Sequence, residues 1–211
     1  MHKVPVAKAV LCAALLASLV SMSGCFPLVV GGVAMGAAAT ADRRTLGAQT
    51  EDKTITVKAE TRLRQLGGEN GHINIASFNR KVLITGEVPD QATKDVAGRE
   101  VRAIEGVQSV ANELVIAGPA SYTSRSSDAL VTTKVKASLV EMTTISASSF
   151  KVVTENGTVY LMGRVTQREG DVATDVTKSV AGVERVVKLF EYITEAELRE
   201  ITPKSMQSTQ L

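Results

Sequence analysis

The strand-like stretch "TVYLMGRV" (residues 158–165) decides the fold, because a matching stretch, "KVLITGEV" (residues 81–88), precedes it in the chain. Apolar residues recur through both stretches with the alternation that is typical of a β-strand. Each stretch carries a glycine at the same place, Gly86 in the first and Gly163 in the second. A glycine inside a strand allows a bulge or a close crossing by a neighbouring element. Because the glycine recurs in two copies, we expect a structural role rather than a ligand site.

The repeat extends well beyond these two strands. Residues 52–63 ("DKTITVKAETRL") align with residues 128–139 ("DALVTTKVKASL"). Further on, "GVQSVANELVI" aligns with "GVERVVKLFEY", which places Gly106 over Gly182 and makes both candidates for structural glycines. Self-similarity at one spacing is the signature of a repeated structural unit, here of roughly 65 residues. The sequence therefore predicts two copies of one small domain.

Each copy is predicted to have the element order αββαβ. A helix comes first, with apolar residues at helical spacing, and Asp52 or Asp128 is expected to be its N-cap. Two strands joined by a tight turn follow, and Asn156-Gly157 is a strong hairpin signal. A second helix and a third strand complete the copy. We therefore expect an α+β fold with two tandem αββαβ domains, each a three-stranded mixed sheet with two helices on one face.

The first residues of the chain are typical of an export signal. Two lysines precede an apolar run over residues 10–20, which is shorter than the ~20 residues that a membrane span needs. The following "SMSGC" (residues 21–25) resembles a bacterial lipobox. This resemblance implies cleavage before Cys25 and lipidation of Cys25. Cys12 leaves with the signal, so no disulfide within the processed chain is expected.

These features divide the chain into six segments. We expect a lipoprotein signal peptide (1–24), a lipidated N-terminus and flexible tether (25–50), the first domain (51–118), a linker (119–126), the second domain (127–194), and a short helix with a disordered tail (195–211).

Composition argues against several functions. Removing the two lysines of the signal from the 24 basic residues leaves 22, equal to the 22 acidic residues, so the basic field of a nucleic-acid binder is absent. The one histidine after the signal, His72, lies in the turn-rich "GGENGHIN" and is interpreted as an exposed loop residue. Catalytic triads and metal clusters need more such groups. We expect no enzyme activity, no metal and no cofactor.

The first helix of the second copy carries the candidate binding surface. At 100° per residue, Leu130 falls off the apolar stripe, and Thr133, Lys134 and Ala137 share its outward face. The position that matches Leu130 in the first copy is Thr54. An exposed leucine beside a lysine suits contact with an anionic lipid surface. A single exposed leucine is also ordinary, and Leu130 could pack against the first copy instead.

The paired copies resemble the BON domain family. The resemblance rests on the "V-x-L-x-G-x-V" pattern of the second strand and the "G-V-x-x-V" before the third, and two such domains behind a lipobox are similar to dual BON-domain outer-membrane lipoproteins. Phe26 stands where an aspartate tends to retain lipoproteins at the inner membrane, which favours the outer membrane. The resemblance implies a non-enzymatic protein of the periplasmic face. It also implies that the second domain binds anionic phospholipid and that the protein supports envelope integrity.

A second interpretation remains open from the sequence. The sheets or the Leu130 helix could dock a partner protein of the envelope without any direct recognition of lipid. Binding to vesicles and capture of a protein from solubilised membrane would separate the two.

Overall fold

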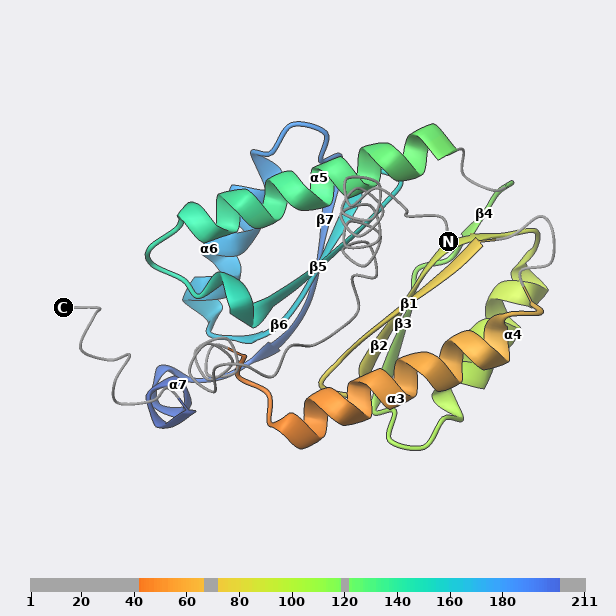
Figure 1. Cartoon of the computed structure of the whole chain (residues 1–211), viewed down its shortest axis with the longest axis horizontal. Helices are drawn as coiled ribbons and strands as arrows, with labels where there is room; N and C mark the ends of the chain where they lie inside the picture. The colour runs from red at the N-terminus through yellow and green to blue at the C-terminus, as the bar shows by residue number, and fades with distance from the viewer. Residues whose placement is uncertain (1–41, 67–71, 119–121, 202–211) are drawn as a thin grey trace, which may run out of the picture. The chain divides into compact units, whose positions relative to one another are not determined.

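The computed structural model describes residues 42–66, 72–118 and 122–201, which form two α+β domains of the same design (Figure 1). Cys25, the signal and the residues after 201 lie outside the described residues. In each domain a hairpin supplies two antiparallel strands, and a helix then crosses over to a third strand that runs parallel to the second. The predicted αββαβ order and mixed sheet are confirmed.

The first domain contains three main strands with β2 at the centre of the sheet. Its elements are α3 (Leu46–Leu63), β1 (His72–Phe78), β2 (Lys81–Val88), α4 (Gln91–Arg102), β3 (Ser109–Asn112) and the two-residue β4 (Val115–Ile116). The last strand was expected to be continuous. It is divided because Glu113 and Leu114 leave the ladder, and Leu114 is buried in the core.

The second domain repeats this order with a longer, unbroken third strand. Its elements are α5 (Tyr122–Glu141), a short 3-10 turn η2 (Ala147–Ser149), β5 (Phe150–Glu155), β6 (Thr158–Val165), α6 (Gln167–Lys178) and β7 (Arg185–Tyr192), followed by α7 (Glu195–Ile201). Helix α5 begins inside the residues that were expected to be a linker. In α7, the hydroxyl of Thr194 and the carboxylate of Glu197 cap each other's backbone N–H groups.

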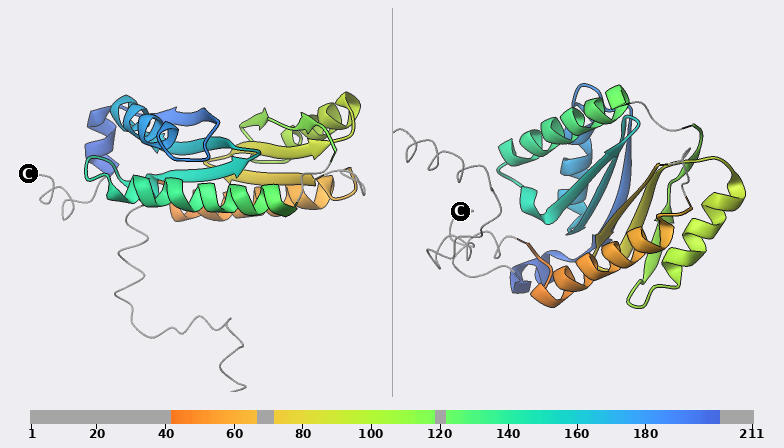
Figure 2. Two further views of the ribbon diagram at one scale, coloured as in Figure 1. Left: turned by 90° about the horizontal axis from the view of Figure 1, so that it is seen from above. Right: turned by 45° about the vertical axis from the view of Figure 1, so that its right-hand side comes forward.

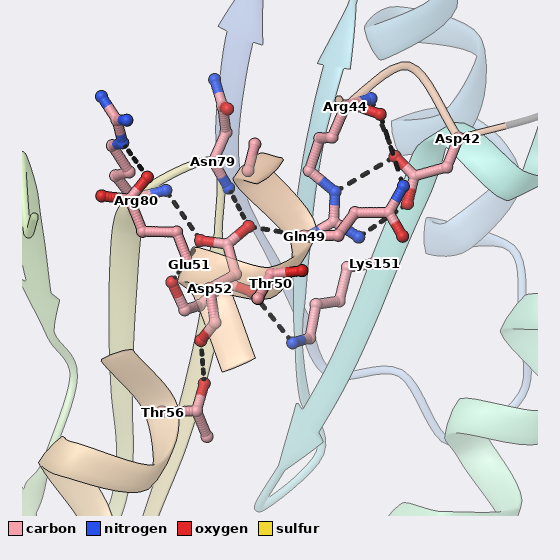
Figure 3. Close-up of polar contacts among 12 residues, drawn as sticks. Asp42, Arg44, Gln49, Thr50, Glu51, Asp52, Thr56, Asn79, Arg80 and Lys151 are labelled. Carbon is pink, nitrogen blue, oxygen red and sulfur yellow. Dashed lines mark hydrogen bonds and ion pairs between the residues drawn. The ribbon is translucent and has the colours of Figure 1, made fainter. Parts of the chain in front are cut away.

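The aspartates expected to be N-caps have a different role. Helix α3 begins at Leu46 with Thr45 as its N-cap, so Asp52 lies inside the helix and is buried. Its carboxylate accepts hydrogen bonds from the backbone N–H groups of Asn79 and Arg80, at 2.7 and 2.8 Å, in the turn of the β1–β2 hairpin (Figure 3). The N-cap prediction was wrong because the helix extends further toward the N-terminus than its apolar stripe.

The second domain repeats this contact. Asp128 lies inside α5 and accepts from the N–H groups of Asn156 and Gly157, at 2.9 and 3.0 Å. Both turns place their two central residues at positive φ, as a type I′ turn requires, which leaves these N–H groups pointing away from the strands. A carboxylate that accepts two backbone N–H groups is a strong, charge-assisted anchor. The first helix of each domain is therefore fixed to its hairpin by one aspartate.

Each domain has its own core between the sheet and its two helices (Figure 2). In the first domain, α3 contributes Ile55, Ala59 and Leu63, which pack with Val82, Ile84 and Val88 of β2 and with α4. In the second, the matching positions of α5 are Val131, Val135 and Leu139, packed against β6 and α6. The apolar stripes predicted from the sequence are the buried faces of these helices.

The opposite faces of the two sheets pack against each other. A third apolar cluster contains residues of both domains: Ala76, Phe78 and Leu83 from the first, and Tyr160 and Met162 from the second. Consequently β2 and β6 are buried on both faces, which explains why seven of the eight residues in each central strand are buried. Polar contacts surround the cluster, including Lys81 Nζ to the carbonyl of Phe190 at 3.1 Å and Lys151 Nζ to that of Ser77 at 3.1 Å.

Two arginines at the start of the described chain join both domains. Arg43 donates two hydrogen bonds of 2.7 Å to the carboxylate of Glu169 in α6. Arg44 pairs with Asp52 at 2.8 Å in the first domain and lies over the ring of Phe78. Part of the range 25–50, which we expected to be a flexible tether, is therefore fixed to both domains from these arginines onwards.

The two central-strand glycines are required by close backbone approach. A Cβ on Gly163 would lie 2.6 Å from the carbonyl oxygen of Ser149, and one on Gly86 would lie 1.9 Å from that of His72. Gly86 also has a φ of +110°, which side-chain-bearing residues rarely adopt. In both domains the obstruction is the chain entering the first strand of the hairpin, not a crossing helix.

We predict that Gly163→Ala lowers the free energy of unfolding by about 1–3 kcal/mol, since backbone must move to admit the new methyl group. Gly47→Ala is the matched control, because a Cβ there meets nothing closer than Thr45 Oγ1 at 3.8 Å. Helix propensity should leave that variant neutral or slightly stabilised. Urea unfolding followed by circular dichroism measures both. Equal stability of the two variants would contradict this role for the glycine.

A second prediction concerns Arg43 and pH. Burial by itself would raise the pKa of Glu169, but the hydrogen bonds from Arg43 and the backbone of Thr166 outweigh it and hold this pKa below its ordinary value. Such a group contributes stability above its unfolded pKa of about 4.3, and the contribution is lost as pH falls through the lower folded value. We expect Arg43→Met to lose about 3–5 kcal/mol at neutral pH, because it leaves Glu169 buried without its partner.

The difference between wild type and Arg43→Met should shrink as the pH is lowered toward about 3. Arg168→Met provides the control, since its ion pair with Glu195 is half-exposed and should be worth less than about 1 kcal/mol. Urea titrations at several pH values measure both variants. A loss for Arg43→Met that does not change with pH would show that the ion pair is not its cause.

Candidate functional site

Helix α5 separates its residues into a buried face and an exposed face. Val131, Val135 and Leu139 point into the core of the second domain, one helical turn apart. Asp128 is also turned inward, to the hairpin. The rest of the helix surface from Ala129 onwards is largely exposed.

The four residues proposed from the sequence share this exposed face. Leu130 is 64% exposed, and Thr133, Lys134 and Ala137 are exposed beside it. The hydroxyl of Thr133 donates its hydrogen to the carbonyl of Ala129, so this donor is not available to solvent. The structure thus brings the four side chains together on one surface and does not pack Leu130 against the first domain.

Val140 extends this surface and was missed in the sequence. It is 71% exposed and lies near the end of α5, one turn beyond Ala137. Comparing the two copies could have identified Val140, because the equivalent position in the first domain is Arg64. We call Leu130, Thr133, Lys134, Ala137 and Val140 the α5 outer face.

The charges inside the α5 outer face are positive, and one exposed carboxylate follows at its end. Between Ala129 and Val140 the charged residues are Lys134 and Lys136, both exposed. The carboxylate nearest in sequence before this stretch, Asp128, is buried. Glu141, the last residue of α5, is an exposed carboxylate directly after Val140. The two lysines beside the apolar residues fit an anionic interface.

The equivalent helix of the first domain differs in its apolar content. On α3 the position of Leu130 is taken by Thr54, and that of Val140 by Arg64. One large apolar side chain, Val57, is exposed within the aligned stretch, and Glu60 adds an exposed carboxylate. The two domains share a fold, but the exposed apolar pair belongs to the second.

His72 does not lie in an exposed loop, so that interpretation was wrong. It is the first residue of β1, and its Nδ1 is buried without a hydrogen-bond partner in the described part of the chain. Glu87 Oε2 lies 3.9 Å from this atom, and Glu155 of the second domain is close by. Glu87 is the cross-strand partner of His72 in the β1–β2 hairpin. Sequence reasoning missed the group because Glu155 joins it only through the packing of the two sheets.

A cavity of ≈ 230 Å³ opens beside this group. Its lining comes from both domains and includes His72, Asn74, Arg125, Asp128, Thr132 and Glu155.

Comparison with known proteins places this architecture in a family. Two ranges of the chain, residues 51–118 and 127–194, match the family model of the BON domain. The chain is 36% identical over 184 residues to the outer membrane lipoprotein DolP of Haemophilus influenzae, covering 86% of this chain and 95% of that one. It is 30% identical over 154 residues to the 21 kDa hemolysin of Actinobacillus pleuropneumoniae, covering 72% and 79%. It is 29% identical over 140 residues to the osmotically-inducible protein Y of Escherichia coli, covering 64% and 70%.

The fold and the matched ranges define a tandem pair of small α+β domains in a protein of the bacterial envelope. The chain belongs to the BON domain family, with two such domains. The chain is similar to an outer membrane lipoprotein over most of both sequences, and it is a lipid-anchored protein of the outer membrane. Within the described residues, no helix has the length and apolarity that crossing a bilayer would take.

Proposed function

We propose that this lipoprotein binds anionic phospholipid through the α5 outer face of its second BON domain, is not an enzyme, and helps to maintain the integrity of the outer membrane. One observation carries the proposal. The α5 outer face presents Leu130 and Val140, both more than 60% exposed, with Lys134 and Lys136 as the charged residues between Ala129 and Val140.

The physical case is that of a helix lying in the membrane interface. Leu130 and Val140 are held by a helix whose other face is fixed in a core, so they cannot turn inward to escape water. Insertion among acyl chains removes their apolar surface from water. The lysine ammonium groups can reach phosphate on long, flexible stems while the apolar residues insert.

Magnitudes indicate a weak site that depends on an anchor. Burying Leu130 and Val140 contributes roughly 1.5–3 kcal/mol each, and each of the two lysines near an anionic surface adds about 1 kcal/mol. The gross sum of about 5–8 kcal/mol, before the entropic cost of association, corresponds to a dissociation constant of roughly micromolar to 0.2 mM. We propose that lipidation of Cys25 compensates, since a tether to the same membrane raises the effective concentration of the site. The site then orients the protein and selects lipids.

We predict that Leu130→Asp weakens binding to vesicles containing phosphatidylglycerol by at least about tenfold, because an apolar anchor is replaced by a charge of the wrong sign. A form lacking residues 1–25 is used, so that the acyl anchor does not mask the effect. Co-sedimentation measures binding, and circular dichroism checks that the exposed substitution leaves the fold intact.

Val57→Asp is the matched control, because Val57 is 60% exposed on the equivalent helix of the first domain. Its binding should stay close to that of the wild type. Raising the salt concentration or replacing the anionic lipid with a zwitterionic one should also reduce wild-type binding. Unchanged binding by a folded Leu130→Asp variant would overturn the lipid site. Loss of a captured envelope protein in the same variant would then favour the protein-interaction function.

A further inference from the structure

Three ligand-bearing side chains meet where the two domains pack together. His72 comes from β1, Glu87 from β2 and Glu155 from β5. One ligand atom from each, a ring nitrogen or a carboxylate oxygen, lies within 4.8 Å of the other two. Two of the three strands belong to the first domain and the third to the second.

The two carboxylates are buried, and the side chain of His72 is 25% exposed. Glu87 is 2% exposed and Glu155 is 6% exposed. Two carboxylates brought so close together in a buried position favour positive charge beside them. Nδ1 of His72 is itself buried with no hydrogen-bond partner among the described residues, although a buried nitrogen normally finds one.

Amide and hydroxyl groups donate hydrogen bonds to both carboxylates. Asn74 Nδ2 and Thr85 Oγ1 donate to Oε2 of Glu155, at 2.9 and 3.2 Å. No described residue donates to its Oε1, and Glu155 lines the cavity. The side-chain amide of Asn156 donates to Oε1 of Glu87. Amide and hydroxyl donors orient carboxylates, which is also the role of the residues behind the ligands in metal sites.

We propose that His72, Glu87 and Glu155 bind a divalent transition-metal ion of the zinc class, with water completing its coordination. One imidazole nitrogen and two carboxylate oxygens are a ligand set that zinc accepts, at about 2.0–2.2 Å. Ligands of a tetrahedral ion at that distance lie roughly 3.4 Å apart, so the ligand atoms must approach one another by up to about 1.4 Å. The imidazole argues against calcium and magnesium, which prefer oxygen. This departs from the expectation of no metal drawn from the sequence.

Two other charged groups face the same cavity. Asp128 is committed to the hairpin turn through two backbone N–H groups. Arg125 lies in the cavity wall, and its positive charge opposes a cation. We therefore expect a dissociation constant in the micromolar range rather than the tighter binding of four-ligand structural zinc sites.

The site exists at one end of the sheet interface alone. The repeat aligns His72 with Ser149, Glu87 with Arg164 and Glu155 with Phe78, so the equivalent group at the other end has no such ligands. A bound ion would connect the two domains directly, because it takes ligands from both.

The test uses the full lipidated protein in micelles of neutral detergent, with ZnCl2 as the probe. Titration calorimetry should give one equivalent of Zn²⁺ bound. Long-range ¹H–¹⁵N NMR of the imidazole, assigned by its loss in His72→Gln, should show Nδ1 shifting on addition of zinc. At a hundredfold excess over the dissociation constant, Tm should rise by roughly 5–10 °C.

Glu155→Gln keeps the shape of the side chain and removes its charge, and it should weaken zinc binding more than tenfold. Glu191→Gln is the matched control, since Glu191 accepts from Asn79 in the same domain interface but lies outside the cluster. The proposal fails if binding is not saturable below millimolar zinc, if Nδ1 does not shift, or if the two glutamine variants bind alike.

Discussion

The packing of one β-sheet against the other determines which surfaces of this protein remain available. Leu83, Tyr160 and Met162 belong to the apolar cluster at this interface, and the two central strands are buried along almost their whole length. Each sheet is covered by its own helices on one side and by the other domain on the second. What remains exposed is the outer face of the helices and the strand edges. A BON domain of about 65 residues has a thin core by itself, and the shared interface adds to the apolar area that both domains bury.

The two domains show how far a repeat can diverge within one fold. Both domains have the glycine in the central strand, the turn at positive φ and the helix aspartate that binds the turn. Each of these features meets a need of the backbone: space for a neighbouring carbonyl, a positive φ, or an acceptor for the N–H groups of the turn. The outer helix faces carry no such requirement, and there α5 has gained Leu130 and Val140 where α3 has Thr54 and Arg64. The shared features thus account for stability, while the differing helix surface is where we place membrane contact.

The sequence predicted the features that depend on neighbouring residues. The hairpin at Asn156-Gly157 and the apolar stripe of α5 follow from local turn chemistry and helical periodicity. Contacts between distant parts of the chain escaped it. Asp52 was interpreted as an N-cap because its true partners, Asn79 and Arg80, follow more than 25 residues later. His72 was assigned to a loop because it lies in a turn-rich stretch, although it pairs with Glu87 across the β1–β2 hairpin. Glu155 approaches it only after the sheets have packed. Leu130, by contrast, could be identified because the first copy has a polar residue, Thr54, at the equivalent position.

Because the two domains share an apolar interface, we expect them to tumble in solution as one body. Backbone ¹⁵N relaxation of the form lacking residues 1–25 measures this by giving a rotational correlation time for each domain separately. We predict one common value for amides of β2 and β6, set by the mass of both domains together. Two distinct and shorter correlation times, each matching a single domain on a flexible linker, would contradict the account.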